Sequence, residues 1–145
     1  MSNSTILLVE DNRDDIELAM YALRKNKIPN DIVVARDGVE ALDFLFATGV
    51  HEGRSEERKP ALILLDLNIP RLNGLEVLRR MRDAPETRRI PVVILTTSDD
   101  ENDIIKGYDF GVNSYIRKPV ELSEFTKIIN QLGLYWLVLN QSSPR

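Results

Sequence analysis

Five polar side chains in this sequence of 145 residues come directly after short apolar runs. They are Glu10, Asp11, Asp66, Thr96 and Lys118. Apolar runs of four or five residues are typical of strands buried on both faces of a parallel sheet. Because ligands bind outside the carboxyl ends of such strands, we expect three carboxylates, a hydroxyl and an ammonium group to share one edge.

The acids Glu10, Asp11 and Asp66 would repel one another if they gathered there. Each carboxylate pair costs about 4 kcal/mol at ~4 Å and an effective dielectric near 20. A divalent cation relieves this repulsion, and an all-oxygen set with room for water suits Mg²⁺, or Mn²⁺, better than zinc. With the Thr96 hydroxyl and the Lys118 ammonium, the metal could surround a tetrahedral anion bonded to Asp66. Phosphoryl transfer requires such positioning and charge neutralisation.

Each of these residues also has a purely structural interpretation. Asp66 alone could simply cap the turn that follows it, since Asp is a common turn residue. Asp66 and Lys118 could form a buried ion pair, but such a pair would not need two more acids beside it. Tyr115 on a short strand could be an ordinary half-buried sheet residue. His51, the single histidine, falls in a charged stretch where a solvated side chain is expected.

Five apolar runs alternate with five amphipathic segments along the chain. The predicted strands lie at 5–9, 32–35, 62–65, 91–95 and 114–117. The first four predicted helices begin after Asn12, Asp37, Asn73 and Ser98, which are good N-caps, and the closing helix carries apolar residues from 122 to 132. Pro85 and Gly111 are expected to end the third and fourth helices. Such alternation predicts an α/β fold with one parallel sheet covered on both faces.

Composition indicates one globular domain. The chain is 43% hydrophobic and 29% charged, and its net charge of -4 argues against nonspecific nucleic-acid binding. Without cysteine it has no disulfide or thiolate metal site, which fits a cytoplasmic protein, and no stretch has the length and hydropathy of a membrane span. We expect a tail at 1–4, a domain at 5–132, and an apolar extension with a loose end at 133–145.

A specific ordered set of residues resembles a known family. The set comprises Glu10-Asp11, Asp66 with Pro70 and Gly74 after it, Thr96, Tyr115, and Lys118-Pro119. Between about Thr5 and Leu132 the chain thus resembles the receiver domain of two-component response regulators. The charged stretch Gly49–Lys59 and the tail Leu134–Leu137 are similar to those of small stand-alone regulators of bacterial and cyanobacterial phytochrome kinases. The resemblance implies a doubly wound, flavodoxin-like sheet of five strands in the order 2-1-3-4-5, with five helices.

The resemblance also implies the site's chemistry. Asp66 would accept a phosphoryl group from a histidine on a partner kinase. Asp11 and Asp66 would bind Mg²⁺ directly, together with the main-chain carbonyl of Asn68, and Glu10 would act partly through water.

Three further residues would respond to the phosphoryl group. Lys118 would hold a phosphate oxygen. Thr96 and Tyr115 would form a switch pair, in which the hydroxyl moves to the phosphate and the ring turns inward. The output is then a shift between two packings of the same domain.

The implied function is a phosphoacceptor switch and not an enzyme, since it would catalyse only its own phosphorylation and dephosphorylation. Its partners would be a sensor histidine kinase, with a phytochrome as the candidate, and a second copy of the chain. The apolar run from 132 to 139 suggests a homodimer through the last helix and the edge strand. We expect no nucleic-acid or membrane partner.

Two alternatives belong to other functional classes. A Mg²⁺-dependent phosphatase of the phosphoaspartate type needs a second acid two residues after its nucleophile, and Asn68 stands there. A receiver-like binding module that is never phosphorylated would be expected to lose the acids or Lys118, and all of them are present.

Overall fold

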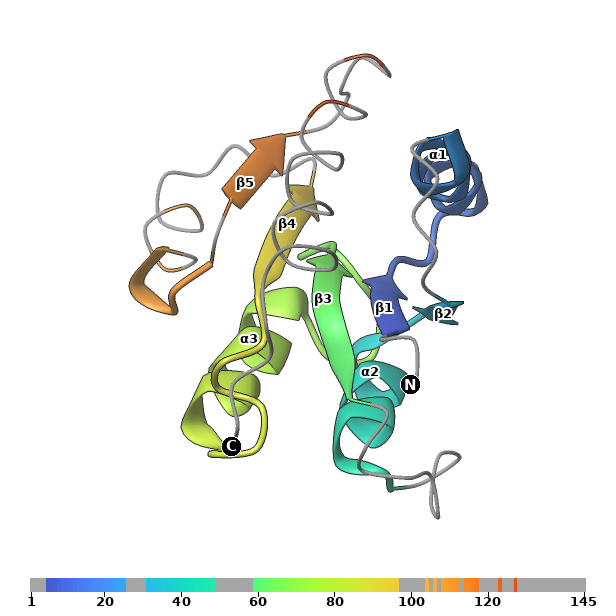
Figure 1. Ribbon diagram of the computed structural model, residues 1–145. Coiled ribbons are helices and arrows are strands. Elements are labelled where there is room, and N and C mark those ends of the chain that lie inside the picture. Colours follow the sequence, from blue (N-terminus) through green and yellow to red (C-terminus); the bar gives the residue numbers. More distant parts are fainter. Residues whose placement is uncertain are drawn as a thin grey trace.

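The computed structural model describes residues 5–25, 31–48, 59–96, 104, 106, 108–112, 114–117, 123 and 127. For Ala22, Thr96 and residues 114–117 it describes the main chain only. These residues form the elements β1 (Thr5–Val9), α1 (Arg13–Lys25), β2 (Asp31–Ala35), α2 (Gly38–Phe46), β3 (Pro60–Leu65), α3 (Gly74–Asp83), β4 (Val92–Thr96) and β5 (Ser114–Arg117) (Figure 1).

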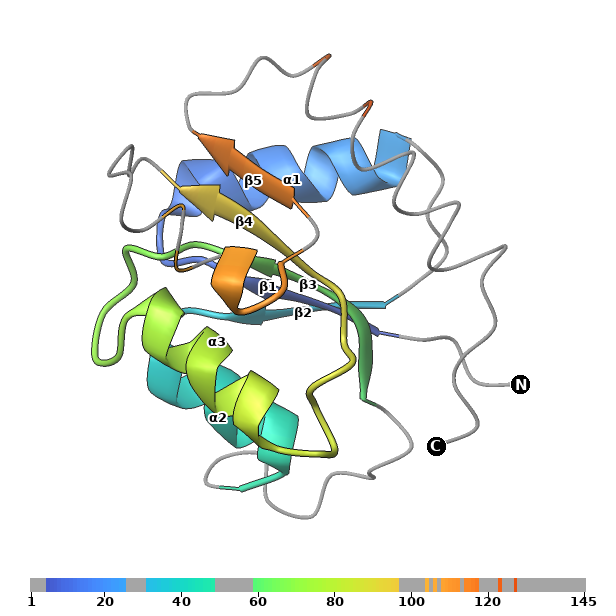
Figure 2. The ribbon, with the colours of Figure 1, turned by 90° about the vertical axis from the view of Figure 1, so that its left-hand side faces the viewer.

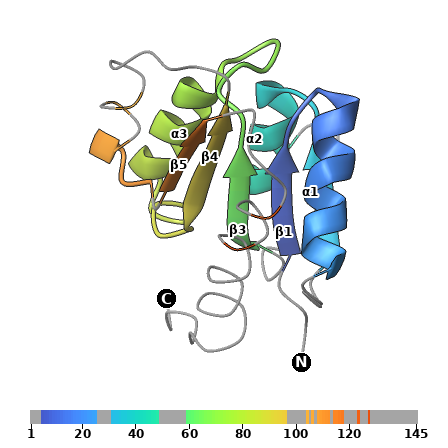
Figure 3. The same ribbon diagram turned by 90° about the horizontal axis from the view of Figure 1, so that it is seen from above.

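The five strands form one parallel sheet in the order β2-β1-β3-β4-β5. Figure 3, in which the strand arrows are seen lengthwise, shows β3 and β1 side by side. This order confirms the predicted fold, because β1 lies inside the sheet and the chain winds outward from it in both directions. The predicted fourth and fifth helices fall mostly outside the described residues.

Each central strand is apolar on both faces because a helical layer covers each face (Figure 2). Alternate residues point to opposite sides, so Leu7 and Val9 pack with α2 and α3 whereas Ile6 and Leu8 pack with α1. The helix residues in the two cores are Ala41, Phe44, Leu45, Val77, Leu78 and Met81 on the first side, and Ile16, Ala19 and Leu23 on the second. Burying each large aliphatic side chain contributes about 1.5–3 kcal/mol, so the sheet is a rigid platform for the residues at its edge.

The three described helices begin at the side-chain caps expected from the sequence. In each case a side-chain oxygen accepts a hydrogen bond from the backbone N–H three residues later, which replaces a partner that the first turn lacks. These bonds run from Asp15 to Asn12 (3.0 Å), from Glu40 to Asp37 (2.7 Å) and from Glu76 to Asn73 (3.0 Å). Each helix therefore starts at a defined residue close to the end of the preceding strand.

Some element boundaries differ from the prediction by one or two residues. β3 begins at Pro60 instead of Leu62, because proline is tolerated at the first position of a strand. Pro60 pairs with Thr5, and the register then shifts by one residue so that Leu62 pairs with Ile6. β4 runs from Val92 to Thr96 instead of from Pro91 to Leu95. The predicted end of α3 before Pro85 is confirmed, since Ala84 is extended at φ -98° and ψ 129°.

Candidate functional site

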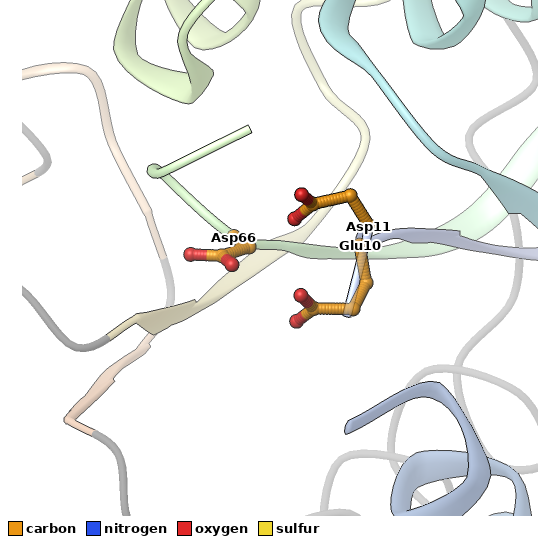
Figure 4. Close-up of side chains that lie close together, drawn as sticks. All are labelled: Glu10, Asp11 and Asp66. Atoms are coloured by element: carbon orange, nitrogen blue, oxygen red, sulfur yellow. The ribbon is translucent and has the colours of Figure 1, made fainter. Parts of the chain in front are cut away.

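Three acids meet at the carboxyl end of the sheet, where the two central strands finish. β1 ends at Val9 and β3 ends at Leu65, and these two residues are register partners in adjacent strands. The residues that follow are Glu10 and Asp11 on one strand and Asp66 on the other. One carboxylate oxygen from each acid lies within 4.8 Å of the other two (Figure 4). The structure thus brings together the three acids that the sequence predicted to be neighbours.

The main chain of the sheet continues past the strands and holds two of these acids. The Glu10 N–H donates to Ala35 O (2.9 Å), and the Asp66 N–H donates to Val9 O (3.0 Å). Glu10 and Asp66 are almost completely buried, with 2% and 6% of their surface exposed, whereas Asp11 is exposed. The cluster therefore consists of two buried carboxylates and one that is exposed to solvent.

Local hydrogen bonds set the orientation of the two buried carboxylates. The Asn12 N–H donates to Glu10 Oε2 (3.2 Å), and the Asn68 N–H donates to Asp66 Oδ1 (3.1 Å). Both are short turns in which a side chain binds the backbone two residues ahead. Carboxylate oxygens held at this spacing are hard ligands, and the cluster fits a divalent cation such as Mg²⁺ or Mn²⁺.

The acceptor loop, which we define as residues 66–73, connects β3 to α3. Leu67 and Ile69 are buried with 4% and 7% exposed and belong to the core below α2 and α3. Asn68 between them is exposed. This alternation anchors the loop through its apolar side chains and leaves Asn68 at the surface beside the acids. Its role as a metal ligand through its carbonyl stays a prediction.

Two glycines allow helices to approach this loop. A Cβ atom on Gly74 would lie 2.6 Å from Asp66 O, and one on Gly38 would lie 2.1 Å from Leu72 O. Real Cβ atoms do not come so close to other heavy atoms. The glycine N–H groups instead donate to the loop, from Gly74 to Leu67 O (2.9 Å) and from Gly38 to Pro70 O (3.2 Å). The first turns of α3 and α2 therefore hold the acceptor loop from two sides.

The three remaining predicted site residues are described only in part. β4 ends at Thr96, which pairs with Arg117 at the end of β5. The main chain of Thr96 is therefore at the same edge of the sheet as the acids. The side chains of Thr96 and Tyr115 are not described, and Lys118 lies outside the described residues.

A fourth acid, Glu76, forms ion pairs with arginines on its own helix. Glu76, in the first turn of α3, accepts hydrogen bonds from Arg79 and from Arg80 Nε (2.8 Å). These bonds lower the pKa of Glu76 to about 2, and the bond from Arg79 has the larger effect. Its charge is thus compensated on the helix surface, and it is not one of the clustered acids.

Sequence analysis did not single out Arg71, which has a positive φ of 68° and forms an ion pair with Asp37. A positive φ at an arginine leaves no composition or spacing signal, because that region of backbone space favours Gly, Asn and Asp. The contact also joins positions 34 residues apart in the chain. Only the tertiary structure could show it.

Among the helices that the structure describes, none is long and apolar enough to cross a membrane.

The chain is similar to known proteins over nearly its full length. It matches the family model of the response regulator receiver domain over residues 6–130. Response regulator Rcp1 of Synechocystis sp. is 40% identical over 132 residues, which cover 91% of this chain and 88% of that protein.

Solved structures of response regulators are also similar to this chain. The phosphorylated cyanobacterial phytochrome response regulator RcpA has a TM-score of 0.83 and 41% identity, and the match covers 97% of this chain and 98% of that one. The Mn²⁺-bound form of Rcp1 also has a TM-score of 0.83, with 38% identity over 97% of this chain and 99% of that one.

Proposed function

The chain belongs to the response regulator receiver domain family, and from this premise we propose that Asp66 is the residue that accepts the phosphoryl group. The observation that carries the proposal is the cluster of Glu10, Asp11 and Asp66 at the end of the two central strands. Of the three, Asp66 alone comes from β3, and one of its oxygens is oriented by the Asn68 N–H. Its carboxylate thus has a defined direction before any phosphodonor arrives.

The phosphodonor in the proposed reaction is a phosphohistidine of a partner histidine kinase. A carboxylate oxygen of Asp66 attacks the phosphorus, an O–P bond forms and the P–N bond breaks. The electron pair of the broken bond returns to the imidazole. Dephosphorylation is the attack of water on the same phosphorus, which releases the Asp66 carboxylate and inorganic phosphate. The protein contributes mostly positioning and charge neutralisation.

Asp11, Asp66 and the main-chain carbonyl of Asn68 are the proposed metal ligands, with Glu10 acting partly through water. A bound Mg²⁺ or Mn²⁺ would supply charge neutralisation for the phosphoryl oxygens. The burial of the three acids supports these roles, because Asp11 is exposed to solvent whereas Glu10 and Asp66 are buried. Rcp1 has been solved in a Mn²⁺-bound form.

Lys118, Thr96 and Tyr115 complete the proposed mechanism. Lys118 would hold a phosphate oxygen, and Thr96 and Tyr115 would change position together when Asp66 carries phosphate. The register of β4 and β5 supports this assignment, since Thr96 pairs with Arg117, the residue before Lys118. Phosphate shifts the population of the domain towards the state in which these contacts are made.

Family membership favours this switch over the two alternatives. Receiver domains generally act in signalling, and we propose that this chain catalyses only its own phosphorylation and dephosphorylation. A phosphatase would need an acid where Asn68 stands. A module that is never phosphorylated would have no need for three clustered acids, whose mutual repulsion costs stability.

A histidine kinase is the partner that the family implies. We propose a phytochrome-type kinase because the similar protein RcpA is named as a cyanobacterial phytochrome response regulator. We further propose a homodimer through the last helix and the edge strand β5, and a cytoplasmic location. The net charge of -4 supports a protein partner rather than nucleic acid.

The test is direct phosphorylation. The protein is incubated with Mg²⁺ and acetyl phosphate, and its intact mass is measured beside that of Asp66→Asn. We expect the mass of one phosphoryl group on the parent protein, none on Asp66→Asn, and no adduct when EDTA removes the metal.

Asp109→Asn is the matched control, because it removes one exposed carboxylate far along the chain from the cluster. It should be labelled like the parent. Equal labelling of Asp66→Asn, or no adduct on the parent, would contradict the proposal.

A further inference from the structure

The acceptor loop contains a turn that arginine does not favour. The Leu72 N–H donates to Pro70 O at 2.8 Å, which closes a three-residue turn with Arg71 at its centre. Arg71 has φ 68°, so this is the γ-turn with positive φ, the rarer and strained of the two forms. A strained turn persists only where surrounding contacts hold it.

The contacts that hold this turn come from the start of α2. Arg71 Nη1 donates to Asp37 Oδ2 at 3.3 Å, and the Gly38 N–H donates to the Pro70 carbonyl at 3.2 Å. Gly38 has no room for a side chain, because a Cβ atom would meet the Leu72 carbonyl. The loop is thus fixed to α2 on both sides of the strained residue.

Asp37 uses its two oxygens for two different elements. Oδ1 accepts from the Glu40 N–H (2.7 Å) as the N-cap of α2, and Oδ2 accepts from Arg71. The Asp37 side chain is 17% exposed and that of Arg71 is 62% exposed. The cap fixes the position of the carboxylate, so Arg71 binds an acceptor that is already in place and loses less freedom in pairing.

We propose that Asp37 and Arg71 are positioning residues for the acceptor loop. The ion pair holds Arg71 in its positive-φ turn, and this keeps the main chain at Asn68 and the Asp66 carboxylate in the arrangement that binds Mg²⁺. Without the pair, the loop samples other conformations, and the apparent affinity for Mg²⁺ falls with the fraction of molecules in the competent one. The inference rests on the proposed metal-dependent function of Asp66.

The experiment measures Mg²⁺ affinity from the amide chemical shifts of residues around the acids, with no phosphodonor present. Asp37→Asn keeps a good N-cap and removes the charge that binds Arg71. Arg71→Ala removes the pair and leaves a residue that, like arginine, disfavours a positive φ. Each should weaken Mg²⁺ binding by about two- to fivefold, the range for a partly exposed ion pair. The double variant should be no weaker than either single one, and Arg71→Lys should recover part of the loss.

Arg71→Gly separates the backbone strain from the ion pair. Glycine adopts a positive φ without strain, so this variant should unfold at a higher denaturant concentration than Arg71→Ala and should recover part of the Mg²⁺ affinity that Arg71→Ala loses. Arg80→Ala is the control, since it breaks a comparable exposed ion pair with Glu76 on α3. It should leave Mg²⁺ affinity unchanged.

Hydrogen exchange of the Leu72 amide in metal-free protein gives a second readout that needs no metal binding. It should be faster in Asp37→Asn and Arg71→Ala than in the parent. Unchanged exchange in both variants, additive effects in the double variant, or an equal loss in Arg80→Ala would overturn the inference. A parent protein that binds no Mg²⁺ would count against the proposed function, and Leu72 exchange would still decide whether the ion pair holds the loop.

Discussion

The three clustered carboxylates place like charges together, and two of them are buried. Glu10 and Asp66 are held by backbone hydrogen bonds to the neighbouring strands, so they cannot move apart without disturbing the sheet. Asp11 is exposed, and its side chain packs against little that would stabilise the fold. We therefore expect the Asp11 carboxylate to contribute more to metal binding than to folding.

Removing the Asp11 charge should therefore stabilise the metal-free protein. We expect Asp11→Asn to raise the free energy of unfolding in EDTA by about 1–2 kcal/mol, because it removes the repulsion with two acids, each about 1 kcal/mol at ~4 Å in a water-like environment. Excess Mg²⁺ should raise the Tm of the parent, because it binds only the folded state, and should raise that of Asp11→Asn much less.

The measurement is thermal and urea unfolding with EDTA and with Mg²⁺. Asp109→Asn serves again as the comparison and should respond to Mg²⁺ like the parent. A lower stability of Asp11→Asn in EDTA would mean that Asp11 makes a stabilising contact that outweighs the repulsion.

The helix starts act as supports for the loop that carries the site. α3 begins at Gly74 under the carbonyl of Asp66, and α2 begins at Gly38 against Leu72. Both helices are in turn packed on the sheet through the apolar core that also contains Leu67 and Ile69. A shift at either helix start would be transmitted to the acceptor loop, because the contacts are between main-chain atoms.

Gly74→Ala tests this coupling. The added methyl group would overlap Asp66 O and Leu67 Cα, at 2.6 and 2.7 Å, so the loop or the helix must move. We expect a loss of about 1–3 kcal/mol of stability and clearly slower labelling by acetyl phosphate. Urea unfolding and intact mass against time measure the two effects.

Gly111→Ala is the matched comparison for this variant. Gly111 has φ 77° and lies beside Arg82, 3.7 Å from the position of an added Cβ, so alanine there is strained without a clash. It should lower stability by about 1 kcal/mol and leave labelling unchanged, since the added Cβ would meet Arg82 of α3 and not a residue of the acceptor loop. Equal slowing of labelling in both variants would indicate a general loss of stability.

Among the described residues, the molecule has a parallel sheet between helical layers, and its edge strands are β2 and β5 (Figure 2). An exposed sheet edge and an apolar helix are a common basis for association between identical chains. The apolar run predicted to form the dimer interface, residues 132–139, lies outside the described residues.

Solution mass tests the homodimer. We expect the parent to run as a dimer in light scattering at micromolar concentration, and Trp136→Ala to shift it towards the monomer mass, because a buried tryptophan is a frequent hot spot of interfaces. Tyr21→Ala, which truncates an aromatic side chain that is 51% exposed on α1, should leave the mass unchanged. A parent protein that is monomeric, or a Trp136→Ala dimer of unchanged affinity, would contradict this interface.

The sheet and the candidate acids could both be predicted from the amino-acid sequence. Strands buried on both faces must be apolar throughout, and helices on a sheet must carry an apolar stripe, so both leave periodic patterns in the chain. Parallel strands share one carboxyl edge, and this rule places Glu10, Asp11 and Asp66 together without any coordinates. Caps such as Asn12, Asp37 and Asn73 were also predictable, because their bonding is local.

The contacts that hold the acceptor loop could not be predicted in this way. The ion pair of Arg71 with Asp37 joins distant parts of the chain, and the positive φ of Arg71 contradicts its residue type. The close approach of Gly38 and Gly74 to main-chain carbonyls likewise depends on how α2 and α3 pack over the sheet. Patterns along a chain report local conformation and burial, whereas such contacts arise only once the elements are assembled in space.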